Sequence, residues 1–196
     1  MDDLDYGVLV NRDNLLQNDY VPRKMYIVDE NENNFHKYKD ASLKPMLRED
    51  IKIYVDCLLR DAHRNGHFII VDSGYRSYDY QQIILRNLLN EKGDVAYKLV
   101  ALPGASEHQT GLAMDIAYLK NGIYDDDVKE DDKEVLWLKN NSYNYGFILR
   151  YPKEKEDVTG YNFEPWHYRF VGLQLAKILH DENITLEEYY TRKRIK

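Results

Sequence analysis

The sequence predicts an α+β fold in which a small, mostly antiparallel sheet is flanked by helices. Three observations lead to this prediction. Apolar residues recur at helical spacing between residues 44 and 64. From Leu112 to Tyr118 they occupy every second position, which is the period of a strand. Helical and strand-like stretches do not alternate as in a parallel βαβ protein, and no internal repeat is present.

The N-terminal half contains two predicted strands and two predicted helices. In order, we expect a strand, a loop, a buried helix, a strand and a helix at residues 6–11, 31–34, 44–64, 67–72 and 78–91. Asn65-Gly66 ends the first helix and Gly93 lies just after the second. Ser73-Gly74 turns the second strand toward the helix that follows, so Arg76 should lie where a strand meets a helix.

The C-terminal half begins at Pro103-Gly104, which interrupts the chain before the strand 112–118. We then expect an acidic loop, a helix, two strands and two terminal helices at residues 121–132, 134–141, 145–151, 164–170, 172–180 and 185–193. The acidic loop is most simply a solvated connection, since it lacks the regular oxygen-ligand spacing of an EF-hand calcium site. Thr159-Gly160 predicts a turn before the last strand, and Thr185-x-x-Glu188 is a capping box that opens the last helix.

The length and composition are those of a globular protein. A chain of 196 residues predicts one domain, with residues 1–43 as an N-terminal extension packing on a core of about 68–196 that carries the motifs. With 43% hydrophobic and 31% charged residues, the chain has the composition of a soluble folded domain. A net charge of −7 argues against a nucleic-acid partner, because binding phosphates requires a basic surface.

The beginning of the chain carries no signal-peptide pattern, because residues 1–7 are acidic. Nowhere do eighteen apolar residues follow one another, so no transmembrane segment is expected. The expectation from the chain as it stands is a cytoplasmic protein. The alternative is an exported or cell-envelope domain whose leader has been cut away.

The central motif places His108 and Asp115 seven residues apart, with Gly111 between them. Glycine adopts positive φ without strain, so the chain can turn sharply at Gly111 and continue as the strand that contains Asp115. In that strand Asp115 lies on the face opposite Met114 and Ile116, between two alanines. A buried carboxylate must be paired, hydrogen-bonded or bound to a metal, and the spacing alone does not decide which.

A second histidine appears much later, in Glu164-Pro165-Trp166-His167. The two histidines and Asp115 form a three-ligand set that leaves a fourth position for water, as in catalytic zinc sites. Pro165 excludes the helical His-Glu-x-x-His arrangement, so a bend must bring Glu164 and His167 to the same site. The other histidines have no motif partner and are expected in loops or at the surface: His36, His63, His67 and His180.

In combination these segments resemble the VanY and VanXY type zinc D-alanyl-D-alanine carboxypeptidases, whose relatives include LdcB-type L,D-carboxypeptidases. The blocks follow the family's order from about residue 70 onward: Ser73-Gly74-Tyr75-Arg76-Ser77, the segment from Ser106 to Asp115, Tyr145-Gly146-Phe147, and Glu164-Pro165-Trp166-His167-Tyr168-Arg169. The resemblance implies a zinc site in a cleft above the sheet, with His108, Asp115 and His167 as ligands.

The same resemblance implies the roles of four further residues. Glu164 would act as general base, and Arg76 would stabilise the oxyanion or orient the substrate. Gln81 and Ser106 would hold the terminal D-residue of a peptidoglycan stem peptide or precursor. Three functions are open at this point: a zinc D,D-carboxypeptidase, an L,D-carboxypeptidase acting on tetrapeptides, and a zinc-containing binding module without catalysis. The presence of Glu164 and Arg76 disfavours the third.

Overall fold

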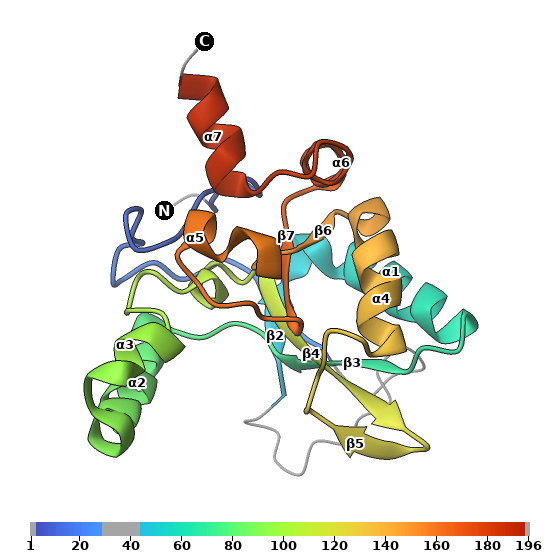
Figure 1. The fold of residues 1–196 in the computed structure, drawn as a ribbon, viewed down its shortest axis with the longest axis horizontal. Helices are drawn as coiled ribbons and strands as arrows, with labels where there is room; N and C mark the ends of the chain where they lie inside the picture. Colours follow the sequence, from blue (N-terminus) through green and yellow to red (C-terminus); the bar gives the residue numbers. More distant parts are fainter. Residues whose placement is uncertain (1–2, 29–43, 195–196) are drawn as a thin grey trace.

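The structure is a computed structural model that describes residues 3–28 and 44–194. At its centre is a five-stranded sheet whose paired strands are all antiparallel (Figure 1). The spatial order is β3 (Ile69–Ser73), β4 (Ala113–Lys120), β7 (His167–Phe170) and β6 (Phe147–Leu149), with β5 (Ile123–Asp125) pairing with β4. A smaller sheet joins β1 (Met25–Ile27) to β2 (Met46–Arg48). The predicted α+β class with a mostly antiparallel sheet is confirmed.

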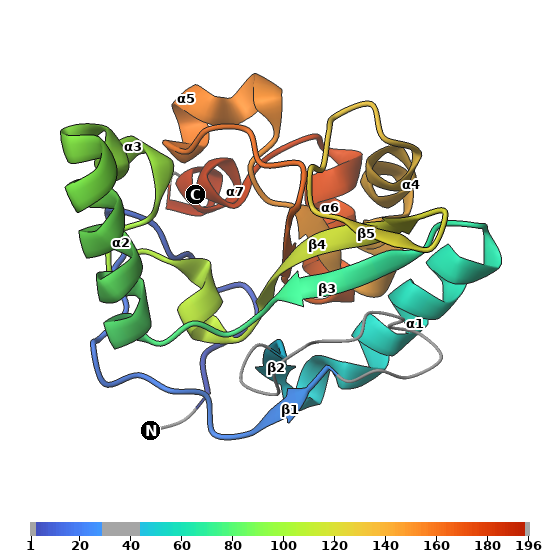
Figure 2. The same ribbon diagram turned by 90° about the horizontal axis from the view of Figure 1, so that it is seen from below.

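Helices lie at both ends of the long axis of the molecule. One end is formed by α2 (Tyr78–Lys92) and α3 (Ala96–Leu99), and the other by α1 (Lys52–Arg64) and α4 (Lys133–Asn141) (Figures 1 and 2). α6 (Leu173–Asp181) lies nearer the middle and contacts β6. The described helices also include α5 (Glu156–Thr159) and α7 (Leu186–Arg194). β4 runs between these two groups of helices (Figure 2).

The main hydrophobic core lies between α1 and the sheet. Val55 and Leu58 of α1 are fully buried against Met114 and Ile116 of β4, as the alternation in the sequence predicts. Burial of each such side chain contributes about 1.5–3 kcal/mol. Asp115 therefore lies on the opposite face of β4, away from this core.

Several predicted helix boundaries agree with the structure within one or two residues. α2 begins after Ser77, whose side-chain oxygen accepts a hydrogen bond from the Tyr80 amide at 3.1 Å, and it ends at Gly93. α4 and α6 lie at the predicted positions. At α7 the predicted capping box forms: the Thr185 amide donates to Glu188 at 2.8 Å, and the Glu188 amide donates to the Thr185 hydroxyl at 3.2 Å.

The predicted strand at residues 6–11 is wrong. Within this segment the structure has a turn at Tyr6-Gly7 and only a single bridge between Asn11 and Asn14. The backbone oxygens of Tyr6 and Val8 accept hydrogen bonds from the Arg169 guanidinium instead of from a neighbouring strand. The hydrogen bonds that a neighbouring strand would donate to these oxygens therefore come from a buried arginine side chain.

The predicted helix at 44–64 is correct only from Lys52 onward. Residues Met46–Arg48 form β2, followed by a 3₁₀ turn at Glu49–Ile51. Leu47 and Ile51 are both fully buried in the core that α1 also reaches, so their spacing suits either structure. Pairing of β2 with β1 decides the conformation, and no local pattern reveals that partner.

The predicted acidic loop at 121–132 contains a strand. Asn121 and Gly122 both have positive φ, and they join β4 to β5 in a tight hairpin. An Asn-Gly pair is a strong hairpin signal, so the sequence contained the information that the loop prediction missed. The strands predicted at 145–151 and 164–170 are shorter in the structure, at Phe147–Leu149 and His167–Phe170.

The N-terminal segment is attached to the rest of the chain through backbone oxygens. Gln17 and Tyr20 accept hydrogen bonds from the Gln109 side chain, and Leu4 accepts one from Arg48. The predicted loop 31–34 and His36 lie outside the described residues. Among the helices of the described ranges, none combines the length and the apolar character that crossing a membrane requires.

Candidate metal centre and active site

Strand register brings Asp115 and His167 together. In the pairing of β4 with β7, Asp115 lies directly opposite His167, and on its other side Asp115 lies opposite Ser73 of β3. Residues directly opposite in an antiparallel pair project to the same face with short Cβ separations. Asp115 Oδ1 is accordingly 3.0 Å from His167 Nδ1. Two residues separated by 52 positions in the chain thus meet on one face of the sheet.

The tight turn at Gly111 places His108 beside Asp115. His108 lies in the 3₁₀ turn Glu107–Thr110, and Gly111 then takes the predicted left-handed conformation with φ +68° before β4 begins. The buried Nδ1 of His108 lies 2.6 Å from the backbone oxygen of Gly74. A side chain at position 74 would have its Cβ 2.3 Å from the Met46 oxygen, so only glycine allows the chain to pass there.

A β-turn at Pro165 brings Glu164 to His167. The His167 amide donates to the Glu164 oxygen at 3.1 Å, which closes a turn with Pro165 at its second position, where proline is favoured. Glu164 Oε2 consequently lies 3.7 Å from His167 Nδ1. β7 starts only at His167, so the two side chains are not on opposite faces of one strand. This turn is the bend that the sequence required.

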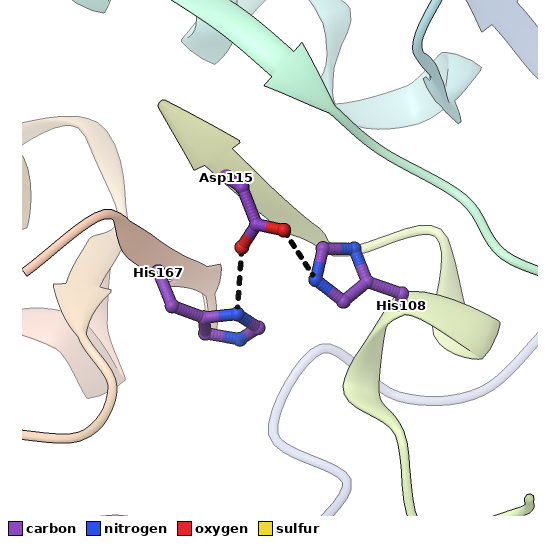
Figure 3. A group of neighbouring side chains, drawn as sticks. All are labelled: His108, Asp115 and His167. Carbon is purple, nitrogen blue, oxygen red and sulfur yellow. Dashed lines mark hydrogen bonds and ion pairs between the residues drawn. The ribbon is translucent and has the colours of Figure 1, made fainter. Parts of the chain in front are cut away.

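His108, Asp115 and His167 form a group that could hold a metal ion, with one ligand atom from each lying within 4.8 Å of the others. The Asp115 carboxylate lies between the two imidazole rings (Figure 3). Ligands of a tetrahedral zinc ion with bonds of about 2.1 Å are roughly 3.4 Å apart, so small side-chain movements would close this group around an ion.

The neutral state of the His108 ring makes the group suitable for binding a cation. Burial and the Arg76 guanidinium lower the pKa of His108 to about 4, so the ring is neutral at pH 7. Its hydrogen must be on Nδ1, because the Gly74 oxygen can only accept. Nε2 therefore presents a lone pair, without a hydrogen-bond donor, 3.2 Å from an Asp115 oxygen. Two facing acceptors are stabilised by a cation placed between them.

Asp115 and His167 also favour binding of a cation in this group. Burial opposes ionisation of Asp115, but its hydrogen bond with His167 holds the pKa of this carboxyl well below its usual range. Burial would lower the pKa of His167, whereas its hydrogen bond with Asp115 and the nearby Glu107 carboxylate raise it to about 9. A bound cation would replace a proton on this ring. The donor set of two imidazoles and one carboxylate fits zinc.

Arg76 contacts the group directly. Its Nη2 lies 2.7 Å from Asp115 Oδ2, and its backbone amide donates to the His108 oxygen at 3.2 Å. Gln81, predicted to bind substrate, lies behind Arg76 on α2: its Oε1 is 3.5 Å from Arg76 Nη1, and its amide nitrogen donates to the Ala101 oxygen at 2.8 Å. Both polar ends of Gln81 are therefore already engaged with the protein.

A cavity of about 210 Å³ opens beside the group. All of the predicted site residues line it: Arg76, Gln81, Ser106, His108, Asp115, Glu164 and His167. Trp166 and Leu99 contribute partly exposed apolar side chains to its wall. Burial raises the pKa of Glu164, and the negative charge of Asp115 adds to this effect. The carboxyl is thus closer to the pH at which it can exchange a proton with a substrate.

Sequence reasoning missed Glu107, the residue before His108. It is fully buried; Arg150 Nε donates to it at 2.8 Å, and Arg169 Nη1 forms an ion pair with it at 2.9 Å. Burial would raise its pKa, but the two arginines hold the pKa of this carboxyl well below its usual range. Its second oxygen lies 3.5 Å from His167 Nε2. A charged residue inside an otherwise buried motif was the available signal.

The remaining described histidines lie away from this group. His180 is exposed and its ring stacks on Tyr143 at 3.7 Å between centroids. The ring of His63 packs near Phe68. His67 is more buried than a surface residue, with a side chain 15% exposed and its Nδ1 3.9 Å from Glu134. None of these three belongs to the group that could hold a metal ion.

Comparison with known proteins gives a family match over most of the chain. The model of the VanY family, described as D-alanyl-D-alanine carboxypeptidase, matches residues 44–173. The protein YodJ of Bacillus subtilis (strain 168) is 40% identical over 185 residues, which cover 94% of this chain and 66% of YodJ. Across four curated relatives, the chain spans between 40% and 66% of their lengths.

Two solved structures are similar over almost the whole chain. The LdcB LD-carboxypeptidase has a TM-score of 0.83 and 39% identity, covering 93% of this chain and 84% of LdcB. A mutant of the vancomycin resistance D,D-pentapeptidase VanY from the VanB-type resistance cassette, in complex with Zn(II), has a TM-score of 0.76 and 32% identity. That match covers 94% of this chain and 98% of the other.

Proposed function

The chain belongs to the VanY family of D-alanyl-D-alanine carboxypeptidases, and on that premise we propose that it is a zinc metallopeptidase acting on peptidoglycan peptides. Its proposed reaction is hydrolysis of the C-terminal D-alanine of a stem peptide or precursor. The observation that carries this proposal is the meeting of His108, Asp115 and His167 beside Glu164 in one cavity. A zinc-binding module without catalysis would not need a buried carboxyl with a raised pKa at this position.

The two histidines and Asp115 would hold the metal, His108 through Nε2 and His167 through Nδ1. When bound, zinc supplies a Lewis acid that lowers the pKa of a water molecule from about 15.7 to about 7 and polarises a carbonyl. The Gly74 oxygen would keep His108 in the tautomer that leaves Nε2 available.

Glu164 would move the proton in this reaction. The side chain takes a proton from the attacking water onto a carboxylate oxygen and returns it to the leaving amino group of D-alanine. Its burial raises the pKa toward the working pH, which suits a group that must both accept and release a proton. The turn at Pro165 holds Glu164 in the lining of the cavity, next to the proposed metal ligands.

Arg76 would orient the substrate or stabilise the oxyanion of the tetrahedral intermediate. Its guanidinium lines the cavity and already contacts Asp115, so it can reach the reacting carbonyl without entering from outside. Ser106 lines the same cavity and would contact the terminal D-residue. Gln81 would act on the substrate mainly by holding Arg76, because its own amide is engaged with Ala101.

A second candidate reaction is L,D-carboxypeptidase activity on tetrapeptide stems. The similarity to LdcB, with a TM-score of 0.83, favours it as a specific alternative to D,D-cleavage. Both reactions would use the same catalytic residues. Incubation with defined pentapeptide and tetrapeptide stems, followed by mass measurement of the products, distinguishes them. D,D-activity shortens the pentapeptide by one D-alanine, and L,D-activity converts the tetrapeptide to a tripeptide.

The metal is tested on the same preparation. Elemental analysis should find one zinc ion per chain, and removal of zinc by a chelator should abolish cleavage. Cleavage that persists at full rate in zinc-free protein would refute the metallopeptidase proposal. The cytoplasmic location, the lack of a nucleic-acid partner and the single-domain organisation stay predictions, open to cell fractionation, binding assays and limited proteolysis.

A further inference from the structure

Beside Nε2 of His167 lies a buried group of four charged side chains. Glu107 Oε1 accepts a hydrogen bond from Arg150 Nε at 2.8 Å and lies 2.9 Å from Arg169 Nη1. The side chains of these three residues are completely buried. The fourth member, Glu187, binds Arg150 through both of its oxygens at 2.6 and 3.0 Å. Two carboxylates thus balance two guanidinium groups.

This group connects the metal centre to the C-terminal helix. Glu187 belongs to α7, which lies outside the residues 44–173 matched by the family model. On the other side, Arg169 Nη2 donates to the backbone oxygens of Tyr6 and Val8 at 3.0 and 2.9 Å. A buried ion pair contributes little to net stability, although breaking one is costly. Stability alone is therefore a weak reason for placing four charges at this position.

Glu107 Oε2 and His167 Nε2 have no hydrogen-bond partner among the described residues, and they face each other at 3.5 Å. The other nitrogen of the ring, Nδ1, faces Asp115 and Glu164. A neutral imidazole has one hydrogen, so if Nδ1 presents its lone pair to an ion, the hydrogen is on Nε2. Glu107 Oε2 is then the acceptor directly in front of it.

We propose that Glu107 is a positioning residue that accepts the Nε2 hydrogen of His167, and that Glu187 on α7 holds Glu107 in place through Arg150. The first contact fixes the tautomer and the orientation of the ring, as carboxylates do for histidines that bind metals elsewhere. The second contact, from Glu187 through Arg150 to Glu107, links the C-terminal helix to the metal centre. This inference rests on the zinc site proposed above.

A glutamine at position 107 would reverse the tautomer preference. The arginines on one side of residue 107 are donors only, so the amide oxygen must face them. The NH₂ group would then face His167 Nε2, which would have to accept, and the ring hydrogen would move to Nδ1. That is the nitrogen that an ion needs, so Glu107→Gln opposes metal binding while keeping the size of the side chain.

The test measures zinc affinity by competition with a chromophoric chelator, and the position of the His167 ring hydrogen by NMR of the zinc-loaded protein. Glu107→Gln should weaken zinc binding by about 10- to 100-fold. The control is Glu134→Gln, which removes an equally buried carboxylate beside His67 and should leave the affinity unchanged. In the wild-type protein the ring hydrogen should be on Nε2 and exchange slowly with water.

A folded Glu107→Gln variant that binds zinc as tightly as the wild type would overturn the inference. If this variant does not fold, Glu187→Gln decides: the inference expects zinc affinity to fall by about 2- to 30-fold. Its control is Glu182→Gln, which removes an exposed ion pair with Arg192. Unchanged affinity in Glu187→Gln would then refute the coupling. Wild-type protein that binds no zinc would overturn the proposed function itself.

Discussion

Replacing Glu164 by glutamine separates proton transfer from metal binding. The substitution keeps the shape of the side chain and the turn that holds it, because the turn hydrogen bond uses the backbone oxygen of Glu164. The three proposed ligands, His108, Asp115 and His167, are untouched. We therefore expect the Glu164→Gln variant to fold and to retain one zinc ion per chain, while hydrolysis of the stem peptide is lost.

The size of the loss follows from the role of a general base. Removing such a group costs about 10²- to 10⁴-fold in rate, which corresponds to about 2.7–5.4 kcal/mol of transition-state stabilisation. The same substitution should leave the metal-free protein at least as stable as the metal-free wild type. Burial raises the pKa of Glu164, so its contribution to stability is fully present only below the unfolded pKa and is lost as the pH rises through the folded pKa. At neutral pH the ionised side chain thus costs stability.

The assay combines zinc content, cleavage rate and thermal unfolding on one preparation of the variant. The expected result is normal zinc content, a rate lower by at least about 100-fold, and an unfolding temperature of the metal-free variant at or above that of the metal-free wild type. Loss of zinc together with activity would make Glu164 a ligand or a structural residue. An unchanged rate would remove it from the mechanism.

Three further predictions concern the site and its surroundings. Arg76→Ala should lower the cleavage rate by about 10²- to 10³-fold, with zinc retained; a drop in zinc content instead would show that Arg76 acts only by supporting Asp115. Because the pKa of His167 is raised to about 9, a proton competes with zinc, and apparent zinc affinity measured by chelator competition should fall about tenfold for each pH unit from 8 down to 5.5. An affinity independent of pH over that range would contradict this account. Thr185→Ala should cost about 0.5–2 kcal/mol of unfolding free energy, measured in urea, because Thr185 caps α7; an unchanged unfolding free energy would contradict this role.

Local features of this protein could be predicted from neighbouring residues alone. The helix that follows Ser77, the capping box at Thr185 and the positive φ of Gly111 all depend on interactions within a few residues. The face of β4 that carries Asp115 follows from strand geometry in the same way. The loop prediction at Asn121-Gly122 failed although the local signal was present.

Other features depend on partners distant in the chain. Residues Met46–Arg48 form a strand because they pair with β1. Residues 6–11 do not form a strand, because the Arg169 side chain donates hydrogen bonds to their backbone oxygens. Both partners, β1 and Arg169, are distant in the chain from the segments that they contact, so a local sequence pattern does not reveal them. The two arginines that form ion pairs with the buried Glu107, Arg150 and Arg169, are also distant from it in the chain.

The sequence by itself determined which residues can bind a metal ion and which of them lie next to a turn. It identified His108, Asp115, His167 and Glu164 as candidates, since two imidazoles and a carboxylate are what zinc binds. Only the tertiary structure decided that they meet. The pairing of β4 with β7 places Asp115 opposite His167, and the turn at Pro165 brings Glu164 to the same ring. Strand register depends on hydrogen bonds between distant segments, so no short stretch of sequence contains it.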